Sequence, residues 1–494
     1  MQIPLPLVDL PPDVAPSEVP RRRRIYVNRN LRFDLVSTVG FDMDYTLAIY
    51  RQEAMDQLSI DATSEKLVDQ LGYPACLRTA PYRTDFAIRG LLIDRKHGNV
   101  LKMDRYRYVK KAYHGMRELT REERHRTYHS RPVRAGTDRY HWVDTLYGLS
   151  EVSVYAGAIE ALGEIGVEVD AGKLFDDIRA SIDLAHQDGS IVDRIAADPA
   201  RYLVRDPDLA ATFHKLRSAG KRLFLLTNSH AGYTDKIMRY LLDGQLAGYS
   251  SWRSFFEFIG TAAKKPTFFT RDDVPFEPAE DDMSPPNGSF QRGRMYKGGC
   301  LAELQRLTES ENDRVLYVGD HIYGDVLRAK KETAWRTAMI IQEMDQELAV
   351  HETIAPKLER MDDLEAVRDL LHEERRSQKD RLRKVGKGLE AAREEGRRAT
   401  DLEAQKVGLK KSIERIKRRL RDLDRELEEL ESLVDGSYHP FWGALFKSGP
   451  EVSTFGDQVE QYACIYTDRV SNFLYYSPLH YFRSPRDRMP HELF

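Results

Sequence analysis

Four short apolar runs, each followed directly by polar residues, predict buried parallel strands. They cover residues 35–39, 221–226, 314–318 and 337–341. Each run is short and nearly continuous in apolar residues, which is typical of a strand that is covered on both faces. Helical patterns separate the runs. The chain is therefore predicted to be an α/β protein with a parallel sheet.

Chemically capable side chains follow three of these runs. They are Asp42 and Asp44 after the first run, Thr227, Asn228 and Ser229 after the second, and Asp320 and Asp325 after the third. In open α/β sheets the ligand crevice lies beyond the carboxyl ends of the strands. We therefore expect these distant residues to meet in space.

Two changes of pattern divide the chain further. The first two runs are separated by about 160 residues, too many for a crossover, which predicts an inserted, mainly helical cap domain. Near the C-terminus, Ile413, Ile416, Leu420, Leu423, Leu427 and Leu430 alternate by three and four. This seam predicts a helical coiled-coil hairpin that packs on itself or on a second copy, and it is too regular for a single solvated helix.

The last segment is rich in aromatic residues and needs a core to cover it, so we expect it to return to the main body. The predicted domains are an N-terminal arm (1–30), a catalytic core (31–55 and 205–360), the cap (56–204), the hairpin (361–435) and the returning segment (436–494).

Charge and cysteine content narrow the class of protein. The 494 residues exceed one typical core, and the net charge of -3 argues against nucleic-acid binding through bulk charge. Cys76, Cys300 and Cys464 lack metal-ligand spacing, which argues against a disulfide framework or zinc site and fits a reducing cytosol. No apolar stretch approaches a membrane span. We expect a cytoplasmic protein with neither a nucleic-acid nor a membrane partner.

The first pair of carboxylates suggests phosphoryl transfer. Asp42 can attack a phosphoryl group and form an aspartyl-phosphate, while Asp44 can protonate the leaving oxygen and later activate water. Thr227 and Asn228 can bind phosphate oxygens. A cation is required to neutralise the negative charge of the phosphate, and a lysine should contact the phosphate.

Mg²⁺ is the expected cation, because it favours oxygen ligands and uses few carboxylates. Asp320 is the expected ligand, and Asp325 could hold one of its waters. Lys265 is the best candidate for the lysine and Lys297 the second. Each residue alone has an ordinary structural explanation as a helix cap or a solvated side chain, but the combination on successive strand ends is rarely accidental.

Four short stretches, "DMDYTL" (42–47), "LLTNS" (225–229), "KKPTFF" (264–269) and "VGDHIYGD" (318–325), resemble the four motifs of the haloacid dehalogenase superfamily. The sequences of these four stretches are most similar to those of the cytosolic purine 5'-nucleotidases, which prefer IMP and GMP. The resemblance implies an α/β fold with a Rossmann-like core, an Mg²⁺-dependent phospho-aspartyl mechanism and a cap with nucleotide contacts. It also implies Lys265 rather than Lys297, and a main-chain carbonyl of Asp44 as a metal ligand.

The same resemblance implies substrate contacts in the cap. Arg179, Asp183 and His186 lie at helical spacing on one face of "DDIRASIDLAHQDGSIV" (176–192), and Tyr147 matches an aromatic that stacks on the base. From the residues alone, Arg179 and Asp183 would be a surface ion pair. Val192 and Gly148 stand where the purine enzymes have a lysine and an asparagine, so the base preference is open.

The leading hypothesis is an Mg²⁺-dependent 5'-nucleotidase that acts on purine nucleoside 5'-monophosphates, and we expect it to form a homo-oligomer through the coiled coil. One alternative is a phosphatase or phosphotransferase for another phosphomonoester. Another is a nucleotide-binding scaffold that acts through its coiled coil.

Overall fold

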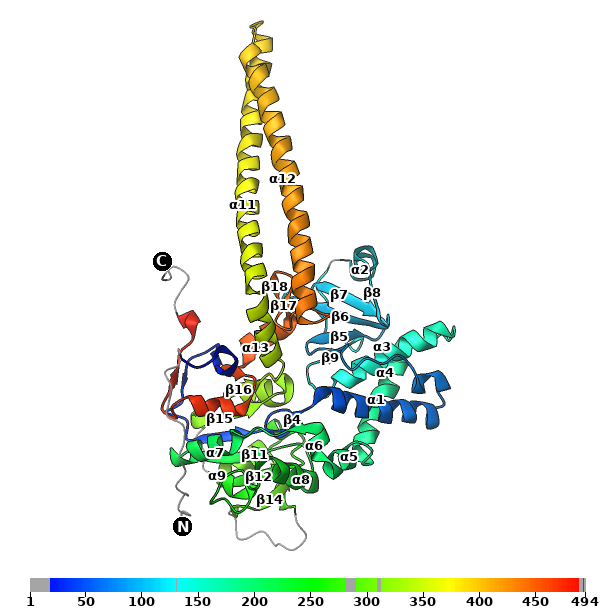
Figure 1. Ribbon diagram of the computed structural model, residues 1–494, viewed down its shortest axis with the longest axis vertical. Helices are drawn as coiled ribbons and strands as arrows, with labels where there is room; N and C mark the ends of the chain where they lie inside the picture. The colour runs from blue at the N-terminus through cyan, green and yellow to red at the C-terminus, as the bar shows by residue number, and fades with distance from the viewer. Residues whose placement is uncertain (1–17, 130, 280–289, 309–311, 488–491, 493–494) are drawn as a thin grey trace. The chain divides into compact units, whose positions relative to one another are not determined.

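The computed structural model describes residues 18–129, 131–279, 290–308, 312–487 and 492. It divides into two compact units, Met1–Gln346 with Leu445–Phe494, and Glu347–Ala444. Figure 1 shows the elements of both units. Of the arm expected over residues 1–30, residues 1–17 lie outside the described part of the chain. No helix among the described residues is long and apolar enough to cross a membrane.

The first unit is built on a mixed sheet. Among the described residues its nine strands have the order β1 (Tyr26–Val27), β19 (Ile465–Thr467), β16 (Arg336–Ile340), β15 (Val315–Gly319), β3 (Thr38–Phe41), β11 (Arg222–Leu226), β12 (Phe258–Thr261), β14 (Met295–Gly298) and β13 (Phe276–Pro278). Neighbours from β19 to β14 are parallel, and only the edge strands β1 and β13 pair antiparallel. The predicted α/β class with a Rossmann-like parallel sheet is confirmed.

The four predicted strands lie side by side in this sheet. They correspond to β3, β11, β15 and β16, with one shift: the first begins at Thr38 rather than at Leu35. Leu35 is 49% exposed and lies in a turn before the sheet. Strands β12, β14 and β19 also belong to the sheet, and β19 brings the C-terminal segment beside β16.

Helices and a buried aromatic cluster support the strands. Flanking helices in this unit include α7 (Leu209–Ser218), α8 (Ala231–Leu242), α9 (Leu301–Thr308), α10 (Arg328–Glu332) and α13 (Thr454–Tyr462). The cluster contains Phe224 of β11, Phe258 of β12, Tyr317 of β15 and Trp335 before β16. It fixes the positions of the strand ends that carry the polar residues.

The insertion leaves the core through β4 (Ile49–Tyr50) and returns through β10 (Leu203–Val204), and these two strands pair with each other. Three helices of the insertion pack together: α1 (Gln52–Asp69), α3 (Leu149–Glu164) and α4 (Ala171–Gln187). The shorter helices are α2 (Arg121–Tyr128), α5 (Val192–Ala197) and α6 (Pro199–Tyr202). The paired strands hold the two ends of the insertion together.

The insertion also contains an antiparallel sheet that the sequence analysis did not predict. Its order is β8 (Arg117–Glu118), β7 (Val109–His114), β6 (Asn99–Met103), β5 (Leu91–Asp94) and β9 (Tyr140–Val143). These strands are short and several carry charged residues, as in the β7 sequence VKKAYH. The charges hide the alternation that normally reveals a strand.

The second unit is a helical hairpin. Helix α11 (Met344–Glu394) and helix α12 (Thr400–Tyr438) are joined by a turn in which Gly396 has a φ of 67°. The expected seam positions Ile413, Ile416, Leu420, Leu423 and Leu427 are buried in α12. Leu364 of α11 packs against Leu423 and Leu427, so the two helices contact each other through this seam.

Candidate active site

A cavity of about 810 Å³ brings together the three polar strand ends. Its lining includes Asp42 after β3, Thr227 after β11 and Asp320 after β15. It continues to residues of the insertion, among them Tyr147 and Arg179. The expectation that the polar residues after these strands would meet is confirmed, because parallel strands in register end at one edge of the sheet.

Lys265 lies between two carboxylates in this cavity. Its Nζ is 2.8 Å from Oδ1 of Asp42 and 2.6 Å from Oδ1 of Asp325, and it also contacts the Tyr317 hydroxyl at 3.0 Å. Burial alone would lower the pKa of Lys265, but the carboxylates of Asp325 and Asp42 raise it well above its ordinary value. The lysine is therefore a fixed positive charge beside Asp42.

The runner-up Lys297 is placed elsewhere. It lies on β14, where its Nζ is 3.5 Å from Glu277 of β13.

Three buried carboxylates form a group that could hold a cation. Asp42, Asp320 and Asp325 each offer an oxygen, and these atoms lie within 4.8 Å of one another. Burial raises the pKa of Asp320 well above its ordinary value, and the charges of Asp325 and Asp42 raise it further. Lys265 supplies one positive charge against three carboxylates, so the donor set fits a divalent cation.

Hydroxyl groups hold both oxygens of the Asp44 carboxylate. Tyr50 donates to Oδ1 at 2.6 Å and Ser229 donates to Oδ2 at 2.6 Å, while the Tyr50 and Tyr233 hydroxyls lie 2.8 Å apart. Burial raises the pKa of Asp44, and the hydrogen bonds from Ser229 and Tyr50 oppose that change. Asp44 is thus oriented by Ser229, which follows β11, and by Tyr50 of β4, where the insertion begins.

The residues after β11 have different surroundings from one another. Thr227 is fully buried, and its hydroxyl accepts a hydrogen bond from the Ser229 amide at 3.1 Å. The Asn228 side chain instead contacts the main chain of Lys265, accepting from its N–H at 2.6 Å and donating to its carbonyl at 3.0 Å. That side chain therefore fixes the loop carrying Lys265, a role the sequence analysis did not foresee.

Four residues expected in the cap line the same cavity. They are Tyr147, Arg179, Asp183 and His186. The rings of Tyr147 and His186 have centroids 4.6 Å apart, and burial lowers the pKa of His186 to about 4. Nε2 of His186 is buried and forms no hydrogen bond with any described residue. Val192 and Gly148, the two departures from the purine pattern, also line this cavity.

Two residues that the sequence analysis missed surround Arg179. Its Nη1 lies 3.1 Å from Nε2 of His141, and its Nε lies 4.0 Å from Oε2 of Glu151. Burial raises the pKa of Glu151 to about 7, with the Arg179 guanidinium opposing the change. Burial and Arg179 lower the pKa of His141 to about 4. Among the described residues Arg179 pairs with Glu151, and it forms no ion pair with Asp183, the partner expected from the residues alone.

Another missed residue is Arg89, which connects the insertion to the third strand end. Its guanidinium is fully buried, donates to the main-chain carbonyl of Asp320 at 2.9 Å and forms a bidentate pair with Glu343. A charged residue within the apolar stretch FAIRGLLI could have signalled such a buried pair. Tyr50, Tyr233, His141 and Glu151 carried no comparable signal.

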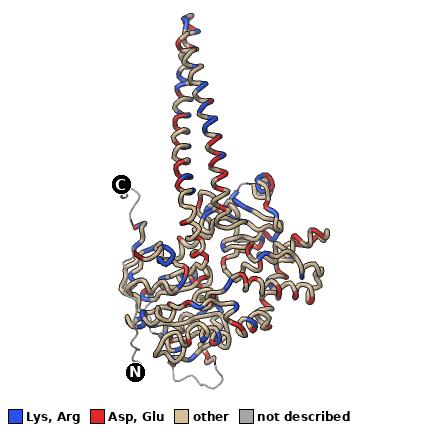
Figure 2. Tube along the Cα trace, viewed as in Figure 1, with Lys and Arg blue, Asp and Glu red and all other residues tan. Residues whose placement is uncertain are grey.

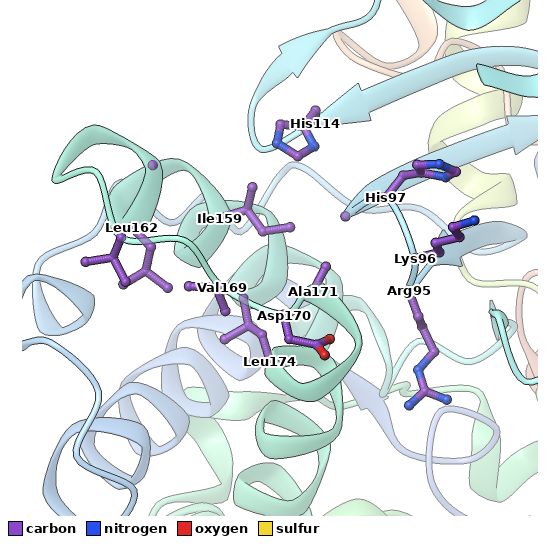
Figure 3. A pocket seen from close by; sticks show the side chains of 13 residues that line it. Arg95, Lys96, His97, His114, Ile159, Leu162, Val169, Asp170, Ala171 and Leu174 are labelled. Atoms are coloured by element: carbon purple, nitrogen blue, oxygen red, sulfur yellow. The ribbon is translucent and has the colours of Figure 1, made fainter. Parts of the chain in front are cut away.

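A second cavity, of about 520 Å³, lies in the insertion between α3, α4 and turns of the antiparallel sheet. Figure 3 shows apolar side chains such as Ile159 and Leu162 on one side, and His114 and Arg95 on the other. Two of its polar side chains have partners: Arg95 pairs with Asp176, and His114 lies 3.0 Å from Asn99. Nε of Arg95 is buried and forms no hydrogen bond with any described residue. None of the candidate catalytic carboxylates lines this cavity.

Comparisons with known proteins identify similar chains. The model of a family described as the 5' nucleotidase family matches residues 25–494. A 5'-nucleotidase domain-containing protein of Dictyostelium discoideum is 29% identical over 478 residues, which cover 95% of this chain and 74% of that protein. Human 5'-nucleotidase domain-containing protein 2 is 30% identical over 364 residues, which cover 70% of this chain and 67% of that protein. One similar solved structure, the HAD-hydrolase YfnB from Bacillus subtilis bound to magnesium, is 13% identical with a TM-score of 0.22, covering 62% of this chain and 86% of that one.

Proposed function

The chain belongs to the 5' nucleotidase family and is a phosphomonoester hydrolase, and we propose that it hydrolyses purine nucleoside 5'-monophosphates through an aspartyl-phosphate. The observation that carries this proposal is the placement of Lys265 between Asp42 and Asp325 in the cavity. The same cavity is also lined by Tyr147 and Arg179 of the insertion. A phosphate and a base could thus be bound in one cavity.

In the first step an oxygen of Asp42 attacks phosphorus, and the bond from phosphorus to the 5' oxygen breaks. Asp44 gives its proton to the leaving oxygen, and its raised pKa supports this role as an acid. Lys265 and the main chain near Thr227 and Asn228 offset the charge on the phosphoryl oxygens.

In the second step water attacks phosphorus, Asp44 takes a proton from that water, and the bond to the Asp42 oxygen breaks. The products are free phosphate and the restored Asp42 carboxylate. Because Tyr50 and Ser229 hold Asp44 from two sides, the same carboxyl group is oriented for both proton transfers.

We further propose that Asp42, Asp320 and Asp325 hold Mg²⁺, with the main-chain carbonyl of Asp44 as an additional ligand. The three side-chain oxygens within 4.8 Å support this assignment. Bound Mg²⁺ supplies positive charge that offsets repulsion between the carboxylates and the substrate phosphate.

A phosphate-release assay over nucleoside monophosphates, sugar phosphates and p-nitrophenyl phosphate tests the proposal, with Mg²⁺ varied and nucleosides added as acceptors. We expect Mg²⁺-dependent release with the highest kcat/KM for purine monophosphates. A higher kcat/KM for sugar phosphates, or transfer to nucleosides in preference to water, would replace this function with one of its alternatives.

A further inference from the structure

The charges of the helical hairpin are segregated by sign along its length. Residues 375–421, around the turn, contain 18 Lys and Arg against 7 Asp and Glu, a net charge of +11. Residues 359–374 and 422–431 together contain 13 Asp and Glu against 3 Lys and Arg, a net charge of -10. We call these the basic segment and the acidic segments. Figure 2 shows blue residues towards the turn of the hairpin and red residues further from it.

These charges lie on the outside of the hairpin. The seam takes the apolar side chains of α12, such as Ile416 and Leu420, whereas neighbouring Arg418 and Arg419 are exposed. Local pairs such as Lys417 with Glu414 at 2.8 Å cannot neutralise the basic segment, because it has 11 more basic than acidic residues. A partner with complementary charge would relieve this repulsion.

We propose that the hairpin binds the hairpin of a second copy of this chain in antiparallel orientation. The net charges of +11 and -10 are opposite and nearly equal, so each basic segment would face the acidic segments of the other copy. On each helix the basic segment is about 30 Å long, and the acidic segments are about 15–24 Å long at 1.5 Å per residue. The arrangement is an isologous twofold interface, in which the same surface is used by both copies.

An exposed apolar side chain lies where the two signs meet. Leu370 of α11 is 67% exposed and is four residues from Glu374, the end of its acidic segment. Antiparallel pairing about this boundary brings the two copies of this region together and covers Leu370. A nucleic acid would use only the basic segment and leave Leu370 in water, so the second copy accounts for more of the surface.

Charge reversal in the full chain tests the proposal. One variant reverses Lys411, Arg418 and Arg419 to Glu, and the other reverses Asp362, Asp369 and Glu373 to Lys; all six are exposed. Each variant alone should dimerise at least about tenfold more weakly by light scattering, because the reversals cut the net charge of the basic segment from +11 to +5, or that of the acidic segments from -10 to -4. An equimolar mixture should form a heterodimer in preference to either homodimer, since the reversed side chains of the two variants carry opposite charges.

The parent dimer should weaken at least about tenfold between low and high salt, because exposed charges are screened. In a matched control, exposed Arg121, Arg126 and Arg131 of the first unit are reversed to Glu. This control should form the same oligomer as the parent chain. Far-UV circular dichroism checks that the helices of each variant are folded. Catalytic activity should persist in every variant.

Three results would overturn the proposal. They are a dimer that either reversal leaves as tight as that of the parent, a mixture of folded variants that dimerises no more tightly than each variant alone, and a parent chain that is monomeric at low salt. If that monomeric parent binds an RNA oligonucleotide, and the first variant does not, the basic segment serves a polyanion instead.

Discussion

The Lys265 ammonium is held 2.8 Å from the Asp42 carboxylate, across the carboxyl edge of the sheet. Asp42 follows β3, whereas Lys265 lies in the loop after β12, two strands away. The contact therefore depends on the order of β3, β11 and β12, and on the loop that Asn228 fixes. It brings a permanent positive charge to the proposed nucleophile.

Asp42→Asn should abolish steady-state turnover, because an amide cannot form the aspartyl-phosphate. Asp44→Asn should lower kcat by about 10²–10⁴-fold, since both proton transfers lose their acid–base group. Phosphate release by proteins verified by mass spectrometry measures both effects. Substantial turnover by verified Asp42→Asn protein would disprove the mechanism.

Gly319→Ala should lower activity about 100-fold without unfolding the protein. A Cβ at Gly319 would lie 2.5 Å from Cβ of Asp325 and 2.6 Å from its Cγ and Oδ2. The displaced carboxylate would lose its contact with Lys265, and a misplacement of about 1 Å can lower the rate about 100-fold. Gly232→Ala in α8 is the control, because nothing lies within 4 Å of its added Cβ. Equal activity of the two variants would contradict the role of Asp325.

Glu151→Gln and Asp183→Ala should affect nucleotides but not small phosphate esters. Both residues line the cavity, Glu151 lies 4.0 Å from Arg179, and Asp183 is on the same helix as Arg179. A hydrogen bond to a charged group contributes about 1.5–3 kcal/mol, so KM for a purine monophosphate should rise about tenfold or more. KM for p-nitrophenyl phosphate, measured in parallel, should stay constant. Equal increases for both substrates would make these residues structural.

The Glu151 carboxyl should also make nucleotide binding depend on pH. With a pKa of about 7, it becomes an acceptor for amino groups of the base as the pH rises from about 6 to about 8. KM for the nucleotide should fall over this pH interval in the parent. The part of this fall that is due to Glu151 should be absent in Glu151→Gln. An unchanged profile in the variant would assign the titration to another group.

Asp56→Asn should stabilise the protein at alkaline pH. Asp56 of α1 is 2% exposed, Gln52 donates to its Oδ1 at 2.9 Å, and burial raises its pKa to about 7. A raised carboxyl pKa means that the folded state binds the proton more tightly than the unfolded state. The contribution of protonated Asp56 to the free energy of unfolding is therefore fully present below about pH 4. It is lost as the pH rises through about 7.

The free energy of unfolding of Asp56→Asn should therefore exceed that of the parent by about 1–3 kcal/mol at pH 8, but not at pH 4. Denaturant titration at both pH values measures the difference. Asp61→Asn is the matched control, because exposed Asp61 accepts from Gln57 at 2.8 Å with the same spacing on the same helix. A uniform difference at both pH values would contradict the role of burial.

Replacing residues 361–435 with a short flexible linker should preserve the catalytic site. The cavity is lined by residues 42–325, all of them in the first unit. We expect kcat/KM for the preferred monophosphate to stay within about twofold and the oligomeric mass to change. A folded but inactive protein at every concentration would show that the hairpin belongs to the catalytic unit.

Local patterns were sufficient to predict several parts of this molecule. Apolar runs located β3, β11, β15 and β16, and polar residues after three of them located the carboxyl edge of the sheet. The alternation of three and four in α12 predicted its buried seam. These features are visible because they repeat over a few residues, whereas the charged strands of the insertion concealed their period.

Only the tertiary structure decided how the side chains of the site are paired. Asp44 is held by Tyr50 of β4 and by Ser229 after β11, and Arg179 lies beside Glu151 of another helix. The division of the chain into catalytic core, cap and hairpin, and the chemical role of each site residue, remain predictions. Sequence periodicity records which side of an element is buried, but the register of neighbouring strands and the packing of helices decide which side chains meet.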